Sequence, residues 1–318
     1  MEIDIQRELI VFYNIENLFY PKNIKFENKN KIDYNSGLRN WDKWKYINKL
    51  HKINHAFQLI QEKEDCLPAL IGFAEVEGKK VLEDLITYKP LSNRYRIVHF
   101  ESLDERGVDV ALLYDKEKIE ILHTEPISFL FDLDHPTETN FDTTRDVLYC
   151  KLKFHNEIIH TFVVHLPSKR EFDINKSKRS FIINEIKKRI IKIKQNGNES
   201  VIILGDFNED PNEENIQNLL FDNELNKTII NPYTELHFNK QYSTFYNKKG
   251  LLFDQILFSD HFIEPKFALQ FEEAKVFNSE ELCDWKNKQK PFRTYAGTRY
   301  LGGYSDHFPV YIKLNSKH

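Results

Sequence analysis

Short apolar runs rich in β-branched residues recur along this chain, and several end directly in a carboxylate, amide or imidazole side chain. A polar residue at a strand end lies beside a rigid sheet, where metal and phosphate sites are commonly built. These residues are spread over nearly the whole sequence, so they form one site only if the fold brings distant strand ends together. The residues at these ends are Asn14, Glu16, Glu75, His165, Asp206, Asn208, Asp254, Asp306 and His307.

These side chains form a set of ligands with a definite chemical preference. The set contains carboxylate and amide oxygens and two histidines, but no cysteine. Hard divalent cations prefer oxygen ligands, whereas structural zinc sites commonly use cysteine. The set therefore predicts a hard divalent cation and a phosphate ester.

The overall charge argues against a dedicated duplex-binding domain. The chain carries 45 Lys and Arg against 49 Asp and Glu, which gives a net charge of −4. Duplex-binding domains usually show a basic excess. Nucleic-acid binding would therefore have to rest on a local patch, and a metal-carboxylate site would itself contribute acidity.

We predict one domain over residues 1–318. The length of 318 residues alone would suggest two domains. The candidate residues, however, span nearly the whole chain, and no linker rich in Gly, Ser or Pro divides it. No obligate protein partner is inferred.

The cysteines and the first residues predict a cytoplasmic protein. Cys66, Cys150 and Cys283 show no metal-binding spacing, and their odd number fits a reducing compartment. The beginning of the sequence lacks the basic region and apolar stretch of a signal peptide. No apolar run approaches the roughly 20 residues of a membrane helix, so no membrane insertion is expected.

Hydrophobic periodicity predicts layered α/β architecture with mixed sheets. The face of the first helix should carry Trp44, Ile47, Leu50, Ile53, Phe57 and Ile60. Polar loops are expected at 21–40 and 135–146. We predict strands at 9–15, 69–76, 94–101, 108–114, 147–154, 158–164, 201–204, 253–258 and 309–314, helices at 41–61, 80–86 and 177–195, and a helix start at 210–211.

Asp206 and Asn208 follow the buried run 201–205. Alternate side chains of an extended segment point the same way, so both residues could approach one substrate. Asp206 would orient or deprotonate a water, and Asn208 would bind a metal or a phosphoryl oxygen. The competing interpretation is a turn, since Gly-Asp and Asn-Glu-Asp-Pro are favourable turn sequences. Taken alone, this motif favours the turn.

Glu75 and His165, at two further strand ends, can also be interpreted either as functional or as purely structural residues. Glu75 ends an apolar strand, where a carboxylate is costly unless it is paired or metal-bound. The strand could instead end one residue earlier, and Glu77 is a competing candidate. His165 could donate to a phosphoryl oxygen or leaving group, although a lone histidine is more often structural.

The remaining candidates are weak in isolation. Asp306 next to His307 could orient the imidazole or bind metal, but both also fit a loop before an edge strand. Arg145 lies in the polar stretch before a strand and could bind phosphate through two hydrogen bonds of its guanidinium group. Most arginines, however, are surface residues without such a role. The basic helix at 176–194 is better explained as a solvated face.

Taken together and in order, seven motifs resemble the endonuclease/exonuclease/phosphatase superfamily, which includes deoxyribonuclease I-like nucleases. The resemblance covers nearly the whole chain, and seven motifs in the correct order are far more specific than any one. The motifs are YNIENLF (13–19), AEVE (74–77), RGVDVA (106–111), HLPSK (165–169), GDFNEDP (205–211), FDQIL (253–257) and YSDHFPV (304–310).

The resemblance implies a four-layer α/β/β/α sandwich, with two mixed sheets packed face to face and helices outside. It also implies phosphoester hydrolysis that depends on Mg²⁺ or Mn²⁺. Asp206 would be the general base for water, with Asn208 stabilising the phosphoryl group. His307 would bind a phosphoryl oxygen, and Asp254 would support a histidine.

The same resemblance assigns the metal and substrate contacts. Glu75 would be the principal metal ligand, Glu16 matches an acidic ligand of some members, and Asp306 would orient His307 or bind metal. Asn14 would contact the metal shell or the scissile phosphate. His165 matches the branches that carry histidine at this motif, which are deoxyribonuclease I-like, sphingomyelinase-like or inositol-phosphatase-like. Arg145 would be a substrate contact.

These expectations favour a metal-dependent phosphodiesterase that acts on DNA or RNA. The alternative is a phosphomonoesterase or a phospholipid or inositol-phosphate phosphodiesterase. Lipid activity would predict an exposed apolar lip, which 129–131 could provide, although this segment could equally be core. A non-catalytic binding module would have lost site residues, and none of the expected positions is replaced. The sequence does not decide between endo and exo cleavage or between one metal and two.

Overall fold

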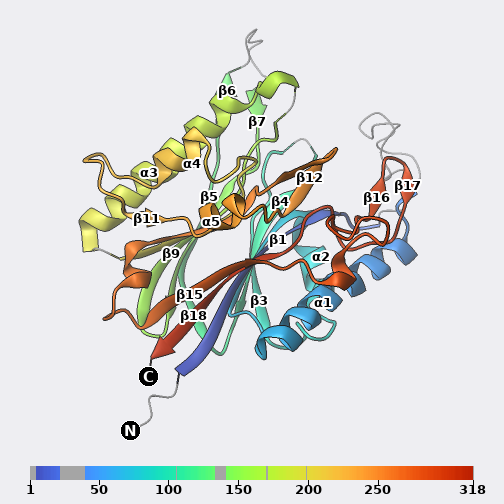
Figure 1. Cartoon of the computed structure of the whole chain (residues 1–318), viewed down its shortest axis with the longest axis horizontal. Helices are drawn as coiled ribbons and strands as arrows, with labels where there is room; N and C mark the ends of the chain where they lie inside the picture. Colours follow the sequence, from blue (N-terminus) through green and yellow to red (C-terminus); the bar gives the residue numbers. More distant parts are fainter. Residues whose placement is uncertain are drawn as a thin grey trace.

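The computed structural model describes residues 5–21, 40–104, 106–132, 141–169, 171–197 and 199–317. Two six-stranded sheets form its centre, and helices lie on the outside (Figure 1). None of the helices within these residues is both long enough and apolar enough to cross a membrane.

The first sheet has the order β15-β18-β1-β2-β4-β3. Strands β1 and β2 pair in parallel, and the other neighbours pair antiparallel. The sheet is therefore mixed. Its strands are β1 (Ile5–Leu18), β2 (Leu70–Val76), β3 (Tyr95–His99), β4 (Asp109–Asp115), β15 (Leu269–Val276) and β18 (Val310–Lys317).

The second sheet has the order β11-β14-β10-β9-β8-β5 and is also mixed, because only β9 and β10 pair in parallel. Its strands are β5 (Ile119–Ile127), β8 (Val147–Phe154), β9 (Glu157–His165), β10 (Ser200–Asp206), β11 (Ile229–Ile230) and β14 (Asp254–Ser259). Three short hairpins complete the strands: β6 (Leu130–Asp132) with β7 (Phe141–Thr143), β12 (Thr244–Tyr246) with β13 (Lys249–Leu251), and β16 (Tyr295–Ala296) with β17 (Arg299–Tyr300).

The helices cover the two outer faces. Helices α1 and α2 pack on the first sheet, while α3 and α4 pack on the second. The bounds are α1 (Lys43–Glu64), α2 (Gly78–Leu85), α3 (Lys176–Gly197), α4 (Glu214–Leu219) and α5 (Tyr233–Phe238), with short 3-10 helices at Glu171–Asp173, Asp260–Ile263 and Glu280–Leu282.

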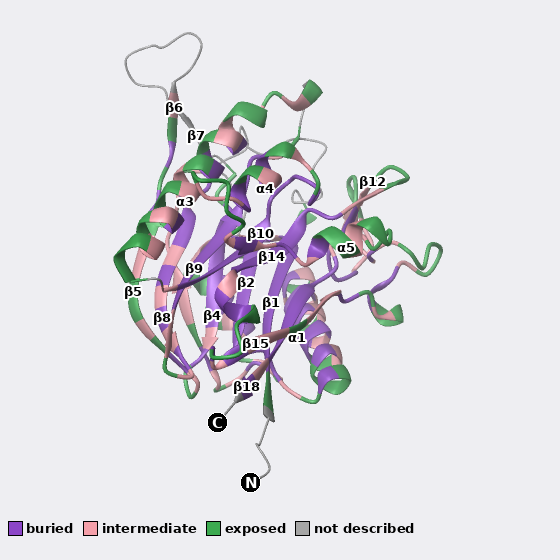
Figure 2. Cartoon of the chain, turned by 60° about the vertical axis from the view of Figure 1, so that its left-hand side comes forward, coloured by how far each residue is buried: buried purple, intermediate pink, exposed green. Residues whose placement is uncertain are grey.

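Strand β10 shows why the molecule has four layers. Ile202 and Leu204 belong to the core that the two sheets share, whereas Val201 and Ile203 pack with the isoleucines of α3. Because successive side chains of a strand point to opposite faces, a fully apolar strand must be covered on both sides. Figure 2 shows these central strands as buried. The predicted four-layer sandwich is confirmed.

The sheets approach closely where β2 crosses β10. A Cβ atom added to Gly72 would lie 2.8 Å from Leu204 Cδ1 and 3.1 Å from Phe12 Cδ2. These distances are below ordinary van der Waals contact, so a larger residue would require the side chains of Leu204 and Phe12 to move. Glycine at position 72 thus permits the tight face-to-face packing.

Most predicted elements are present, with several corrections. The helix start predicted at Asp210 is wrong, because α4 begins at Glu214 and residues 211–212 form a turn. Trp44 is 67% exposed instead of lying on the buried face of α1. Strands β5 and β15 were not predicted. Within the expected loop 135–146, residues 141–143 form β7, and residues 135–140 lie outside the described residues. Residues 22–39 of the expected loop 21–40 also lie outside them.

Candidate active site

Strand register places three of the predicted residues in one row. Asp206 pairs with His165 on parallel β9 and with Asp254 on antiparallel β14. Each residue is the last or first residue of its strand, so all three lie at the same edge of the second sheet. His165 Nε2 lies 3.6 Å from Asp206 Oδ2.

Asn14 links this row to the other sheet. The residue lies near the end of β1, and its Nδ2 donates to Asp206 Oδ2 at 3.1 Å. Its Oδ1 accepts from the backbone N–H of Glu16 at 3.1 Å, and its carbonyl accepts from Ser305 Oγ at 2.7 Å. One asparagine thereby joins residues 192 positions apart in the sequence.

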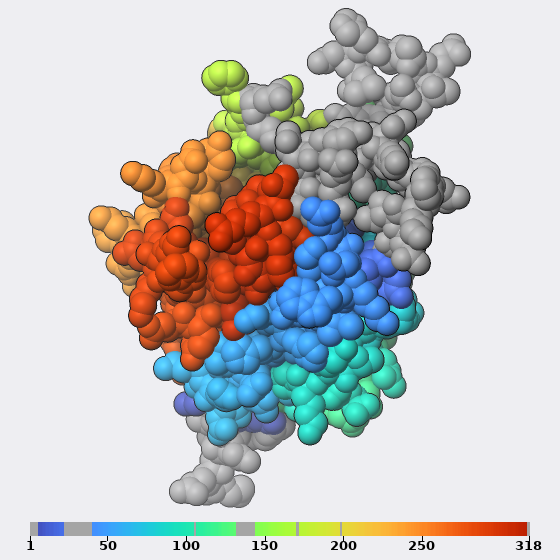
Figure 3. Space-filling view, turned by 90° about the vertical axis from the view of Figure 1, so that its right-hand side faces the viewer, coloured from blue at the N-terminus to red at the C-terminus, as the bar shows by residue number. Residues whose placement is uncertain are grey.

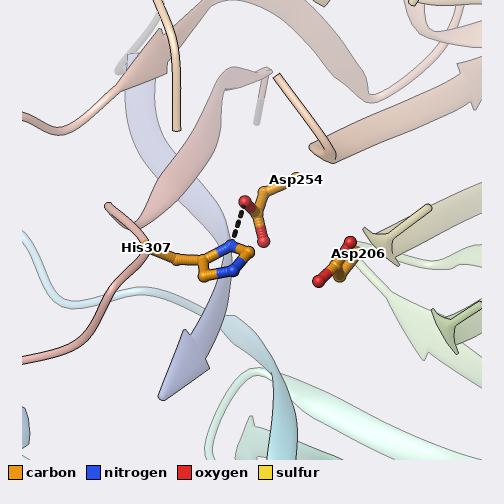
Figure 4. Close-up of side chains that lie close together, drawn as sticks. All are labelled: Asp206, Asp254 and His307. Atoms are coloured by element: carbon orange, nitrogen blue, oxygen red, sulfur yellow. Dashed lines mark hydrogen bonds and ion pairs between the residues drawn. The ribbon is translucent and has the colours of Figure 1, made fainter. Parts of the chain in front are cut away.

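His307 forms an ion pair with Asp254 on the wall of the site. Its Nδ1 lies 2.7 Å from Asp254 Oδ2, and that oxygen also accepts from Ser243 Oγ at 2.5 Å. Figure 4 shows the imidazole beside Asp254, with Asp206 across the intervening space. Burial alone would lower the pKa of His307, but Asp254, Asp306 and Asp206 raise it well above its usual value. His307 is therefore an imidazolium at neutral pH.

Asp206 has the properties expected of a general base. Burial and the nearby charge of Asp254 raise the pKa of Asp206 to about 7, against the lowering effect of His307. Its Oδ1 accepts from the backbone N–H of Asn208 at 2.9 Å. Asn208 has a left-handed backbone (φ 50°) and donates through Nδ2 to the carbonyl of Leu166 at 2.9 Å. A carboxyl group that titrates near neutrality suits proton transfer.

His165 is held in the opposite charge state to His307. Burial, together with the positive charge of Arg145, lowers the pKa of His165 well below its usual value. Its buried Nδ1 has no hydrogen-bond partner among the described residues. In a neutral imidazole one ring nitrogen carries a proton and the other can accept one.

Arg145 is buried and does not face solvent. Its Nε donates to the carbonyl of His165 at 3.2 Å, its Nη2 lies 3.5 Å from the carbonyl of Leu166, and its Nη1 lies 3.7 Å from Asp104. Arg145 therefore supports the segment that carries His165. Its direct contact with substrate stays a prediction.

Glu75 lies at a break in the pairing between β1 and β2. The register shifts after Asn14, and Glu75 has a left-handed backbone (φ 66°). Its carboxylate accepts from the backbone N–H of Asn17 at 2.9 Å and from Arg106 at 3.2 Å. Burial would raise the pKa of Glu75, but Arg106 and Arg145 lower it. Glu75 is therefore ionised at neutral pH.

Glu16 and Asp306 share an arginine. Arg293 Nη2 lies 3.1 Å from Asp306 Oδ2 and 3.4 Å from Glu16 Oε1. The backbone N–H of Thr294 donates to Glu16 Oε2 at 2.6 Å. Burial and the charge of Asp306 raise the pKa of Glu16 to about 7. Both Glu16 oxygens are thus occupied by protein donors, and its role as a metal ligand stays a prediction.

The donor set fits a hard divalent cation. Glu75 is an ionised carboxylate, and Asn14 and Asn208 add amide groups. Asp206, Asp254 and His307 also form a group whose ligand atoms lie within 4.8 Å of one another. In that group His307 Nδ1 already bonds Asp254, so it suits proton and phosphoryl contacts better than metal binding.

Several residues at the site were not identified from the sequence. Arg106 lies in a quoted motif, but no role followed from its position. Arg293 and Ser243 lie outside the quoted motifs, and only the fold places them beside Glu16 and Asp254. Arg293 lies 277 positions from Glu16, and Ser243 lies 11 positions from Asp254 in a separate element, so no periodic pattern could have revealed these contacts.

Comparisons with known proteins agree with this geometry. A model of the endonuclease/exonuclease/phosphatase family matches residues 9–316. No curated protein matches the sequence significantly.

Three solved structures illustrate the shared fold. A family protein from Bacteroides thetaiotaomicron is 14% identical, with 99% of this chain and 97% of that one covered and a TM-score of 0.60. The mannosyl-6-phosphatase Bt3783 from the same organism is 15% identical, with 96% and 99% covered and a TM-score of 0.58. D. rerio TDP2 complexed with a single-strand DNA product is 15% identical, with 98% and 100% covered and a TM-score of 0.58. The family match covers almost the whole sequence, and the chain therefore belongs to the endonuclease/exonuclease/phosphatase family of phosphoester hydrolases.

Proposed function

We propose that this protein is a divalent-metal-dependent phosphodiesterase that acts on nucleic acid. One observation carries the proposal: Asp206 lies buried between Asn14 and His165, and it shares the site with the imidazolium of His307. A base that titrates near neutrality can activate a water molecule, and a fixed positive charge can stabilise the phosphoryl oxygens.

In this mechanism Asp206 accepts the proton of a water molecule that attacks phosphorus in line. His307 donates a hydrogen bond to a phosphoryl oxygen, and Asp254 keeps its imidazole charged and oriented. Asn208 stabilises the phosphoryl group, and His165 acts on the side of the leaving oxygen. Fixed donors of this kind usually provide the largest catalytic contribution.

The metal would be held chiefly by Glu75, next to Asn14. When bound, Mg²⁺ or Mn²⁺ would neutralise negative charge on the phosphoryl oxygens. Asp306 and Glu16 are additional predicted ligands, and Arg293 would have to release them first.

Two observations support a nucleic-acid substrate. The Pro-Ser-Lys-Arg run after His165 and the GDFNEDP motif have a nuclease-like form. The exposed Arg106 and Arg293 form ion pairs with Glu75 and Asp306, and both could contact further phosphates. D. rerio TDP2 is complexed with a single-strand DNA product, whereas Bt3783 is a mannosyl-6-phosphatase. Both substrate classes therefore occur on this fold.

The alternative is a phosphomonoesterase or a phospholipid or inositol-phosphate phosphodiesterase. The expected apolar lip at 129–131 is only partly present, because Phe129 is buried while Leu130 is 55% exposed. A non-catalytic binding module is the least supported function, since such a module would have lost site residues and none of the expected positions in the sequence is replaced.

The proposal is tested by nicking of supercoiled plasmid in Mg²⁺, with EDTA and Asp206→Ala as parallel reactions. Glu224→Ala, an exposed acidic residue away from the site, is the matched control. We expect wild type and the control to nick, and both EDTA and Asp206→Ala to abolish nicking. Nicking that persists in Asp206→Ala would contradict the assigned base.

A second assay distinguishes the substrate classes. The same four reactions would use single-stranded DNA, RNA, a sugar phosphate and a phosphoinositide. Metal-dependent turnover of only the last two would contradict the nucleic-acid proposal while retaining a phosphoester hydrolase.

A further inference from the structure

Arg179 is the largest fully buried side chain within the described part of the molecule. It lies on α3, whose basic residues otherwise fit a solvated helix face. A buried guanidinium is costly unless it is paired and hydrogen-bonded. Its partners therefore indicate what the arginine does.

The guanidinium contacts three separate partners. Nε donates to Glu209 Oε1 at 2.7 Å, Nη1 donates to the carbonyl of Pro167 at 3.1 Å, and Nη2 donates to Asp173 Oδ1 at 2.6 Å. Asp173 is partly exposed, whereas Glu209 and the Pro167 contact are buried. One planar group thus fixes positions in two loops.

These two loops carry the proposed catalytic residues. Pro167 lies two residues after His165, and Glu209 directly follows Asn208. Glu209 is itself fixed, because its carboxylate accepts from Asn215 Nδ2 and its carbonyl accepts from Gln255 Nε2, both at 2.7 Å. Arg179 therefore bridges the segment after β9 to the segment after β10.

The contacts of Arg179 lie just beyond the point where the backbone pairing between β9 and β10 ends. Paired β9 and β10 end at His165 and Asp206, and one more backbone bond, from Leu166 N–H to the Asp206 carbonyl, follows at 2.9 Å. Beyond that point the spacing depends on side chains. Asn208 Nδ2 provides one link, to the Leu166 carbonyl, and Arg179 provides the next.

We propose that Arg179 is a positioning residue for catalysis, which sets the spacing between His165 and the pair Asp206 and Asn208. This inference rests on the roles assigned to those three residues in the proposed function. Arg179 touches none of the reacting atoms and acts through Glu209 and Pro167. A displacement of about 1 Å at a catalytic group can lower the rate roughly 100-fold.

Substitution of Arg179 or Glu209 alone would leave one buried charge unpaired and destabilise the fold. A loss of activity could then not be assigned to altered positioning. The double variant Arg179→Met/Glu209→Leu removes both charges and keeps similar volume, and such replacements are often neutral for stability. We expect its thermal midpoint within about 5 °C of wild type. On bis(p-nitrophenyl) phosphate with Mg²⁺, kcat should fall about 10- to 100-fold while KM stays within about threefold.

The matched control is Arg189→Met/Glu125→Leu, which removes a partly exposed ion pair between the same helix and β5. We expect this control to retain wild-type kcat. A folded Arg179/Glu209 double variant with wild-type kcat would overturn the inference. If that double variant does not fold, Arg179→Lys replaces it, because one ammonium pairs with Glu209 without reproducing the planar fork to Pro167.

Amide hydrogen exchange provides a readout that needs no activity. The amides of Leu166 and Asn208 should exchange faster in the Arg179/Glu209 double variant than in wild type or in the control. Unchanged exchange at both amides would overturn the inference. A wild-type protein without phosphodiesterase activity would instead contradict the proposed function, and the exchange result would still decide the role of Arg179.

Discussion

At the scale of single residues, the site depends on two groups whose pKa values are both displaced upward. Asp206 titrates near 7 because burial and Asp254 disfavour its charge, while His307 stays protonated because three carboxylates favour its charge. Between these two pKa values, Asp206 is ionised and His307 is charged. This is the combination that the proposed mechanism requires.

The first prediction concerns pH. Since only ionised Asp206 can accept a proton, kcat/KM should rise with pH through about 7. It should fall again at alkaline pH, when His307 loses its proton. A profile of kcat/KM against pH, measured with Mg²⁺ saturating throughout, would test this. An acid limb near pH 4 would contradict the assignment of Asp206.

The second prediction concerns Asp254→Asn. The substitution removes the charge that raises the pKa of both His307 and Asp206, so both limbs of the pH profile should move to lower pH. We also expect kcat to fall about 100-fold, because the imidazole loses its orienting carboxylate. Ser243→Ala removes only a hydroxyl from the same carboxylate and serves as the milder comparison. If neither limb of the pH profile moves, the assigned pairing of Asp254 with His307 is contradicted.

At the scale of elements, the central strands could be predicted because each is covered on both faces and therefore has a continuous apolar run. Strand β10 is the clearest case. Strands β5 and β15 were missed because both alternate apolar with charged residues, and most of their residues remain partly exposed. Polar edge strands are expected where a sheet must avoid pairing with other chains. Such strands lack the continuous apolar run that identifies a central strand.

The error at Asp210 has a different physical reason. An Asp-Pro pair suits a helix start, but Asp210 Oδ1 here accepts from the backbone N–H of Leu252 at 2.7 Å. The carboxylate thus ties the loop after β10 to the segment before β14 and caps no helix. A partner 42 residues away cannot be inferred from local sequence.

The third prediction uses the corrected face of α1. Leu50 is buried in the shared core, whereas Trp44 is 67% exposed and contacts Tyr300 edge-on. Leu50→Ala should lower the free energy of unfolding by about 2–5 kcal/mol, and Trp44→Ala by less than about 1 kcal/mol. Urea unfolding followed by circular dichroism would measure both. If Trp44→Ala lowered the free energy of unfolding more than Leu50→Ala does, Trp44 would lie on the buried face of α1, as helical periodicity predicted.

At the scale of the whole molecule, one core cluster contains residues from both sheets, including Phe12 and Leu204. The active site is likewise assembled from both sheets, through the bond between Asn14 and Asp206. The order of the motifs was sufficient to predict this convergence and the fold family. The contacts that Arg106, Arg179 and Arg293 make with site carboxylates and loops could not be predicted, because burial and pairing appear only in three dimensions.

The fourth prediction follows from the shared core. If residues 1–318 form one domain, urea unfolding should be a single cooperative transition. The midpoints from circular dichroism and from tryptophan fluorescence should then coincide. Two separate transitions would contradict the single domain. A substitution at the sheet contact, Gly72→Val, should lower both midpoints equally, since its side chain would meet Leu204 and Phe12.

The left-handed backbone at the strand ends has an evolutionary consequence. Glu16, Asn17, Glu75 and Asn208 all have φ between 50° and 66°, a conformation that costs a residue with a Cβ about 1–2 kcal/mol. Glycine at these positions would relieve that strain but would remove a carboxylate or amide from the site. Selection for thermostability alone would therefore favour glycine at these positions, at the expense of these polar side chains.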